Sequence, residues 1–132
     1  VVKDSCVVVS PIVPMVKTDV GFEFIPIKEN KPFSYQLVLK YMKNKSKLVS
    51  AFHVISEKKL VNPTMVLDYD IFVCGDDKEA IEIVNGLINE IKGLRPIYLG
   101  PGELSYMAEI STPLLLNAMI RNKIKNPGIK II

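Results

Sequence analysis

The stretch DIFVCGDDKEAIEIVNGLINEIKGLRPIYL, residues 70–99, contains three successive hydrophobic patterns. Residues 70–74 are a short apolar run, typical of a buried strand. Residues 77–92 repeat apolar side chains at helical spacing, and Gly93 ends that pattern. Residues 95–99 form a second short strand pattern. A strand, a helix and a strand in this order predict an α/β unit.

The predicted helix at 77–92 has a capping pattern at its start. Asp76 and Glu79 have the spacing of a capping box, in which two side chains satisfy the first backbone amides of a helix. The adjacent carboxylates Asp76 and Asp77 also suit a magnesium ion at a strand end. The capping box explains the same residues without metal, and it is our working interpretation.

The first half of the chain predicts a strand, a long loop, a helix and a strand. Residues 5–10 are a β-branched run, typical of a strand covered on both faces, and residues 48–54 predict a second strand. Residues 10–31 hold three prolines and a glycine, which predict a loop with one short extended piece at 22–27. Residues 32–43 predict a helix that begins at a proline.

The second half predicts a long C-terminal helix. Residues 56–60 favour one helical turn, and residues 100–102, Gly-Pro-Gly, lead into a mostly apolar helix over 103–123. Amides at such a turn can bind an anion, but its proline lacks a donor, which favours a plain tight turn. Pro113 predicts a kink in the helix. The apolar tail, residues 126–132, is expected to dock on the core or on a partner.

Composition excludes several classes of protein. The chain has 132 residues, of which 48% are hydrophobic, and a mean hydropathy of +0.25, enough for one core. Lys and Arg number 17 against 14 Asp and Glu, and this net charge of +3 is too small to indicate nucleic-acid binding. The longest apolar stretches, 48–55 and 111–120, are far shorter than the roughly 20 residues that cross a bilayer. We therefore expect neither a nucleic-acid nor a membrane partner.

The cysteines and the histidine limit the chemistry that a site in this chain can perform. Cys6 and Cys74 each lie in an apolar run, which predicts two buried free thiols in a reducing cytoplasm. His53 is the chain's one histidine, and no close cysteine pair exists, so no metal site is expected. His53 also titrates nearest neutral pH, and three roles stay open: acid or base, ligand contact, or a satisfied structural residue.

The predicted topology places a ligand site at the ends of the first two strands. Ligands on open parallel sheets bind beyond the carboxyl ends of the strands. The loops at 10–21 and 53–57 follow those ends, and the second begins with His53. No Gly-x-Gly-x-x-Gly motif accompanies them, so this sequence alone does not predict a dinucleotide pyrophosphate site.

Five groups of residues carry a resemblance to a known family. They are VVSPIVP at 8–14, VSAFHVI at 49–55, VCGDD at 73–77, GLRP at 93–96 with GP at 100–101, and TPLLLN at 112–117 with GIK at 128–130. In this order and spacing they resemble the NADPH-dependent reductases of the deazaflavin coenzyme F-420, written F420 below. The resemblance spans essentially the whole chain.

The resemblance implies an α/β fold with an incomplete Rossmann-type parallel sheet, followed by a small mixed α/β domain with a long C-terminal helix. Residues 1–59 would be the remnant of the Rossmann domain, and residues 60–132 the small domain on the deazaflavin side of the cleft. The sequence resembles only the later part of these reductases. We therefore expect the Gly-rich nucleotide-binding half to be supplied elsewhere.

The resemblance also implies an oxidoreductase that transfers a hydride between NADPH or NADP and F420. Because the cofactors carry that reaction, no side chain is named as a catalytic acid or base. The implied cofactor-binding residues are Val13, Asp19, His53, Ile55, Glu57, Pro127 and Gly128.

Two other interpretations stay open. The chain is alternatively a non-catalytic module that dimerises or binds a cofactor, or a truncated vestigial homologue. A homo-oligomer is expected in any case, because a half-sheet exposes an edge strand and the long helix carries little charge.

Overall fold

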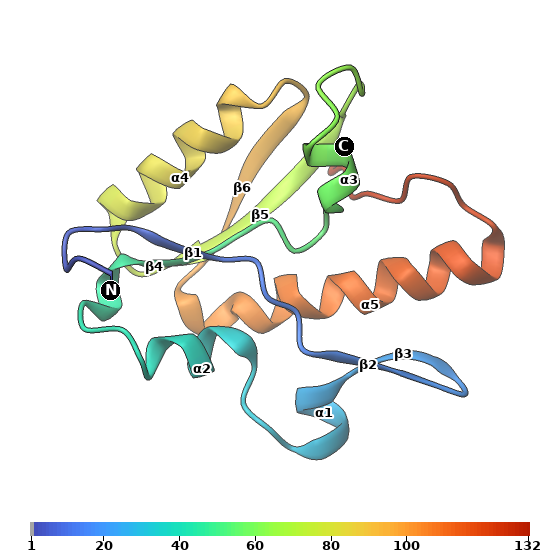
Figure 1. Ribbon diagram of the computed structural model, residues 1–132, viewed down its shortest axis with the longest axis horizontal. Coiled ribbons are helices and arrows are strands. Elements are labelled where there is room, and N and C mark those ends of the chain that lie inside the picture. The colour runs from blue at the N-terminus through green and yellow to red at the C-terminus, as the bar shows by residue number, and fades with distance from the viewer. Residues whose placement is uncertain (1) are drawn as a thin grey trace.

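The computed structural model describes residues 2–132 and contains two sheets (Figure 1). The larger sheet has the strand order β1-β4-β5-β6. Its strands are β1 (Val8–Ser10), β4 (Leu48–Ser50), β5 (Tyr69–Gly75) and β6 (Leu94–Gly100). The smaller sheet is an antiparallel hairpin of β2 (Met15–Thr18) and β3 (Gly21–Phe24).

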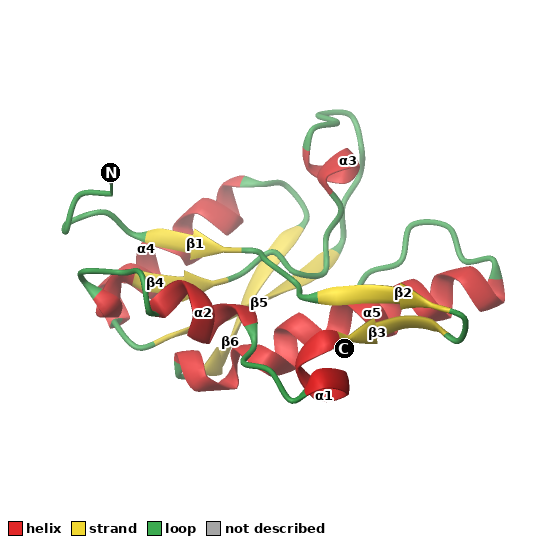
Figure 2. Cartoon of the chain, turned by 60° about the horizontal axis from the view of Figure 1, so that its bottom comes forward, coloured by secondary structure: helices red, strands yellow, loops and turns green. Residues whose placement is uncertain are grey.

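Five α-helices accompany the sheets in the described part of the chain. They are α1 (Ile25–Glu29), α2 (Ser34–Leu39), α3 (Glu57–Leu60), α4 (Lys78–Glu90) and α5 (Ser105–Asn122), with short 3-10 turns at Lys45–Lys47 and Gly102–Leu104. α4 packs on β5 and β6, whereas α5 contacts both β5 and the hairpin (Figure 2). Within residues 2–132, no helix is long and apolar enough to cross a membrane.

The α/β class and the long C-terminal helix are confirmed, and the larger sheet is mixed. β1 runs parallel to β4 and β5 parallel to β6, but β4 and β5 are antiparallel, with Ser50 opposite Cys74. A parallel connection needs a crossover element of a dozen or more residues. The segment 51–68 is long enough for a crossover, but its one regular element is the single turn of α3, and β5 pairs antiparallel with β4. Both predicted domains contribute strands to this sheet, and the division at residue 59 stays a prediction.

The β5-α4-β6 unit agrees with the sequence prediction except at the helix cap. Ile71 of β5 and Val84 of α4 lie in one buried core cluster. The N-cap is Asp77, whose carboxylate accepts the Ala80 amide at 2.8 Å, and not Asp76. Asp76 instead accepts a hydrogen bond from the Gly102 amide at 3.0 Å. This amide, a donor of the predicted Gly-Pro-Gly turn, is therefore already bonded to a carboxylate of this chain. No cluster of metal-ligating side chains occurs in residues 2–132.

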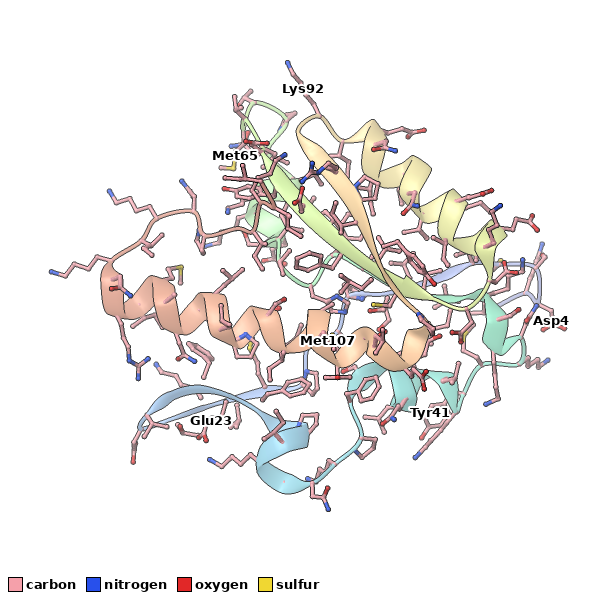
Figure 3. The ribbon with its side chains drawn as sticks, turned by 180° about the vertical axis from the view of Figure 1, so that it is seen from behind. Asp4, Glu23, Tyr41, Met65, Lys92 and Met107 are labelled. Carbon is pink, nitrogen blue, oxygen red and sulfur yellow. The ribbon has the colours of Figure 1, made fainter. Side chains whose placement is uncertain are left out.

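The predicted loop at 10–31 is largely ordered into the hairpin and α1. Asn117 of α5 fixes the hairpin, since it accepts the Phe22 amide at 2.8 Å and donates to the Phe22 carbonyl at 2.7 Å. Gly21 permits this approach, because a Cβ there would lie 2.3 Å from Asn117 Oδ1. Seen from behind, the hairpin strand that carries Glu23 runs alongside α5 (Figure 3). This docking is tertiary, so the local pattern of prolines did not predict it.

Two further predictions need correction. Cys6 is exposed, because it lies before β1 starts and not within the strand. Cys74 is buried in β5 as predicted, and burial raises the pKa of its thiol to about 11. The helix predicted at 32–43 is only six residues long and starts after Phe33, whose extended backbone forms the N-cap.

The C-terminal tail docks on the core, as expected. The Asp70 amide donates to the Ile129 carbonyl at 2.7 Å, and the Ile131 amide donates to the Asp70 carboxylate at 2.6 Å. The side chain of Ile129 packs against the main hydrophobic cluster. The tail therefore extends the packing of β5 beyond its pairing with β4.

The turn after α4 provides a test of the fold. Gly93 has φ +88°, and a Cβ there would lie 1.8 Å from the Leu67 carbonyl oxygen. We expect Gly93→Ala to lower the free energy of unfolding by about 3 kcal/mol or more. The matched control is Gly86→Ala, at an exposed position in α4 with open space around it, which should raise stability by about 0.5 to 1 kcal/mol. Urea unfolding of both variants measures this, and equal effects would contradict the packing described.

Candidate functional site

The loop after β4, residues 51–56, is held in one conformation by its neighbours. The Ala51 amide donates to the Ser10 carbonyl at 3.3 Å and so continues the pairing of β1 with β4. Phe52 has φ +67°, a conformation that bulky side chains rarely adopt and that costs about 1 to 3 kcal/mol. The Thr112 hydroxyl of α5 donates to the His53 carbonyl. Such strain persists only where surrounding contacts stabilise it, and it commonly marks ligand sites.

His53 is buried beside this loop, with an exposed fraction of 6%. Its Nε2 lies 3.4 Å from the Ser50 hydroxyl, while its Nδ1 has no hydrogen-bond partner among residues 2–132. Burial lowers the pKa of His53 to about 4, because the interior disfavours the charged imidazolium. His53 is therefore neutral at pH 7.

A cavity of about 290 Å³, the strap cavity, lies between this loop, α5 and the tail. The strap is the tail segment 124–130, of which Asn126 and Pro127 line the cavity. The other lining residues are His53, Val54, Ile55, Ser56, Lys59, Thr112, Leu115, Leu116 and Met119. Its wall is mostly apolar, with a few polar groups that include the His53 imidazole and the Lys59 ammonium, which is typical of a site for a small organic ligand.

A second hollow of about 650 Å³, the open cleft, is lined by the same loop together with residues of α4 and of the segment after β1. It is lined by Pro11, Val13, Met15, Phe52, His53, Ile55, Glu57, Leu60, Leu87, Ile91 and Thr112. His53, Ile55 and Thr112 line both the open cleft and the strap cavity. The two spaces therefore adjoin at these three side chains.

Comparison with known proteins finds proteins of similar sequence. Over 86 residues, 65% of this chain, it is 43% identical to the F420-dependent NADP reductase of Methanocaldococcus jannaschii and 36% identical to that of Methanothermobacter thermautotrophicus. Over this segment the chain is similar to the F420-dependent NADP reductases. The aligned segment spans 39% and 37% of those two proteins, less than half their length.

The structural comparison agrees with the fold. A chain from Arthrobacter sp. FB24, assigned to the F420-dependent NADP reductases, superposes with a TM-score of 0.77 over 94% of this chain and 56% of its own length. Its sequence identity is only 19%, so this likeness supports the fold alone. No family model matches the sequence.

The structure brings most of the predicted cofactor-binding residues together. Val13, His53, Ile55 and Glu57 line the open cleft, and Pro127 lines the strap cavity. Their assignment to the cofactors of the F420-dependent NADP reductases stays a prediction.

The other two predicted residues lie outside both spaces. Asp19 is exposed in the turn of the hairpin and lines neither of them. Gly128 lies against Tyr69, since a Cβ there would come within 1.9 Å of that ring. The close approach of the strap to Tyr69 thus accounts for this glycine.

Among the lining residues that sequence reasoning missed are Thr112 and Lys59. Thr112 interrupts an apolar stretch and precedes Pro113 in a helix, a signal that was visible in the sequence. Lys59 gave no signal, because a lysine beside Glu57 and Lys58 is typical of an exposed surface, yet it is only 6% exposed.

The buried histidine predicts a pH dependence. The unfolded chain binds a proton at His53 near pH 6.5, whereas the folded chain does so only near pH 4. The unfolded state thus binds more protons in this window, so stability falls as the pH falls from about 6.5 to 4. Between pH 7 and 5 we expect His53 to contribute a loss of about 2 kcal/mol, which His53→Gln lacks. Proton NMR of the one imidazole and unfolding at both pH values measure this, and a pKa near 6.5 would contradict it.

Proposed function

We propose that this chain forms the deazaflavin side of a site that transfers a hydride between NADPH or NADP and F420. This proposal is supported by the names of the similar proteins, F420-dependent NADP reductases, which denote NADP-dependent oxidoreductases. In this proposal the deazaflavin binds in the strap cavity and the nicotinamide ring in the open cleft. The cofactors supply the hydride chemistry, and the protein holds the two rings together.

The observation that carries the proposal is the shared boundary of the two spaces. A direct hydride transfer needs two flat rings in contact, with water excluded between them. His53, Ile55 and Thr112 line both spaces, so ligands in each would meet at these side chains. Because His53 is neutral at pH 7, it adds no charge at that boundary. These features favour hydride transfer over proton transfer by a side chain.

The lining residues fit a deazaflavin and a nicotinamide ring, but they offer little to the phosphates of NADP. The unpartnered Nδ1 of His53 is a buried polar atom beside both spaces, able to bond a polar edge of a ring. The charged residue of the open cleft is Glu57, which would repel a phosphate. We therefore propose that a nucleotide-binding segment outside this sequence holds the phosphates, either in the same polypeptide or in a second chain.

Filling the strap cavity tests the deazaflavin assignment. Met119 lines the cavity from α5, whereas Ile120, on the same helix, is 54% exposed and lies outside it. We expect Met119→Trp to weaken the binding of oxidised F420 at least about tenfold, because an indole occupies the space of the ring. Ile120→Trp should leave affinity within about twofold. Quenching of deazaflavin fluorescence in a titration measures both variants.

The wild-type titration decides between the candidate functions. Binding of F420 without NADP supports a chain that keeps its half of the site. If the folded chain binds neither cofactor, the hydride-transfer proposal is wrong, and a non-catalytic module is favoured. Equal loss in both tryptophan variants would place the ligand outside the strap cavity.

A homo-oligomer remains part of the proposal. Ile27 of α1 is 71% exposed and Leu114 of α5 is 63% exposed, and both flank a hollow of about 440 Å³ beside the hairpin. Exposed apolar groups around a hollow favour association. We expect light scattering to give a mass above 14.8 kDa that falls to the monomer in Leu114→Glu. A monomeric wild type at high concentration would contradict this.

A further inference from the structure

Lys59 is a buried cation that only neutral groups bind. Its Nζ donates to the Pro127 carbonyl at 2.8 Å and to the Tyr69 hydroxyl at 3.1 Å, and it lies 4.3 Å from the centre of the Tyr69 ring. An ammonium carries three N–H donors. The third has no oxygen acceptor within residues 2–132.

No carboxylate compensates this charge. In the described chain the ion pairs of lysines involve Lys28, Lys31, Lys47, Lys78 and Lys130, and Lys59 takes part in none. A buried unpaired charge is costly, so such side chains are normally paired or ligand-bound. The carbonyl, the hydroxyl and the ring face offset part of this cost. The positive charge of Lys59 therefore still lacks a negatively charged partner among residues 2–132.

A negatively charged group that pairs with Lys59 would lie in the strap cavity, which Lys59 lines. Lys59 is the charged side chain among the lining residues, which include neither aspartate nor glutamate. His53, the other basic lining residue, is neutral at pH 7 because it is buried. Ser56 and Thr112 add hydroxyl groups to the wall. The cavity thus combines apolar walls with a single ammonium group.

We propose that Lys59 recognises an anionic oxygen of the ligand that occupies the strap cavity. This inference deepens the proposed function, on which it rests, by assigning the charge of the deazaflavin ligand to one side chain. The anionic oxygen belongs either to the deazaflavin ring or to the acidic side chain attached to it. Lys59 is a binding residue, and it exchanges no proton or hydride in this role.

The test compares three substitutions in the full chain. Lys59→Met should weaken F420 binding at least about tenfold, because a charge-assisted hydrogen bond is lost. Lys59→Arg keeps the charge and should stay within about threefold of wild type. The matched control is Lys58→Met, which removes an exposed charge from the next residue and should change affinity less than about twofold.

A fourth variant separates charge from a loosened strap. The Tyr69 hydroxyl also donates to the Asn126 carbonyl at 3.1 Å, so Tyr69→Phe removes one hydrogen bond to the strap and one to Lys59 but keeps the Lys59 charge. If Lys59 acts only by holding the strap, Tyr69→Phe and Lys59→Met will weaken binding equally. Our proposal expects the larger loss in Lys59→Met. Repeating the titrations with the deazaflavin ring lacking its acidic side chain identifies the source of the anion, because the Lys59 effect persists only if the ring oxygen is bound.

A second measurement is independent of the deazaflavin. Nitrogen NMR of the lysine ammonium groups, with inorganic phosphate as the probe, should shift the Lys59 signal and leave the Lys58 signal unchanged. If the wild type binds F420 and Lys59→Met binds it equally, the inference is wrong while the proposed function stands. If the wild type does not bind F420, the proposed function fails, and the phosphate titration alone decides: a selective Lys59 shift supports the anion site, and no shift overturns it.

Discussion

The buried carboxylate of Asp70 is the group on which the C-terminal part of the structure depends. It is fully buried. It accepts hydrogen bonds from Nε and Nη2 of Arg95, each at 2.8 Å, and from the Ile131 amide at 2.6 Å. The Arg95 guanidinium is the main cause that lowers the pKa of Asp70. Arg95 also donates to the Ile131 carbonyl at 2.7 Å, so the two side chains together bind the tail backbone. This pair therefore anchors the end of the tail just beyond the strap, and the strap itself is held by Lys59, by Tyr69 and by the Asp70 amide.

The two cavities follow from the short contact between β4 and β5. β4 has three residues and meets β5 only at Cys74 and Gly75. The other end of β5 pairs with the tail through Asp70. The loop at 51–56 therefore leaves the sheet between these two contacts, and Thr112 holds it against α5. The strap cavity and the open cleft are both lined by residues of this loop.

Local patterns in the sequence predicted most of the strands and helices. They did not predict contacts between segments that are distant in the sequence. The β5-α4-β6 unit was predictable because its apolar periods are long and Gly93 ends the helix. The hairpin was not, because its position depends on Asn117, 95 residues away from Phe22. The cap moved from Asp76 to Asp77 because Asp76 bonds Gly102 across the fold. A single-sequence pattern carries no information on such pairs.

The burial of the charged and titratable side chains in the candidate site was likewise not predictable from local patterns. Strand-end loops pointed to His53, Ile55 and Glu57, but burial of the single histidine and of Lys59 appears only once α5 and the strap are in place. Glu57 and Lys59 are two residues apart on one helical turn and line different spaces. The exposed Glu57 acts through solvent and is screened, whereas the buried Lys59 is not. The lining of the strap cavity therefore favours an anionic group and that of the open cleft disfavours one, a difference in charge that would distinguish the two ligands of the proposed function.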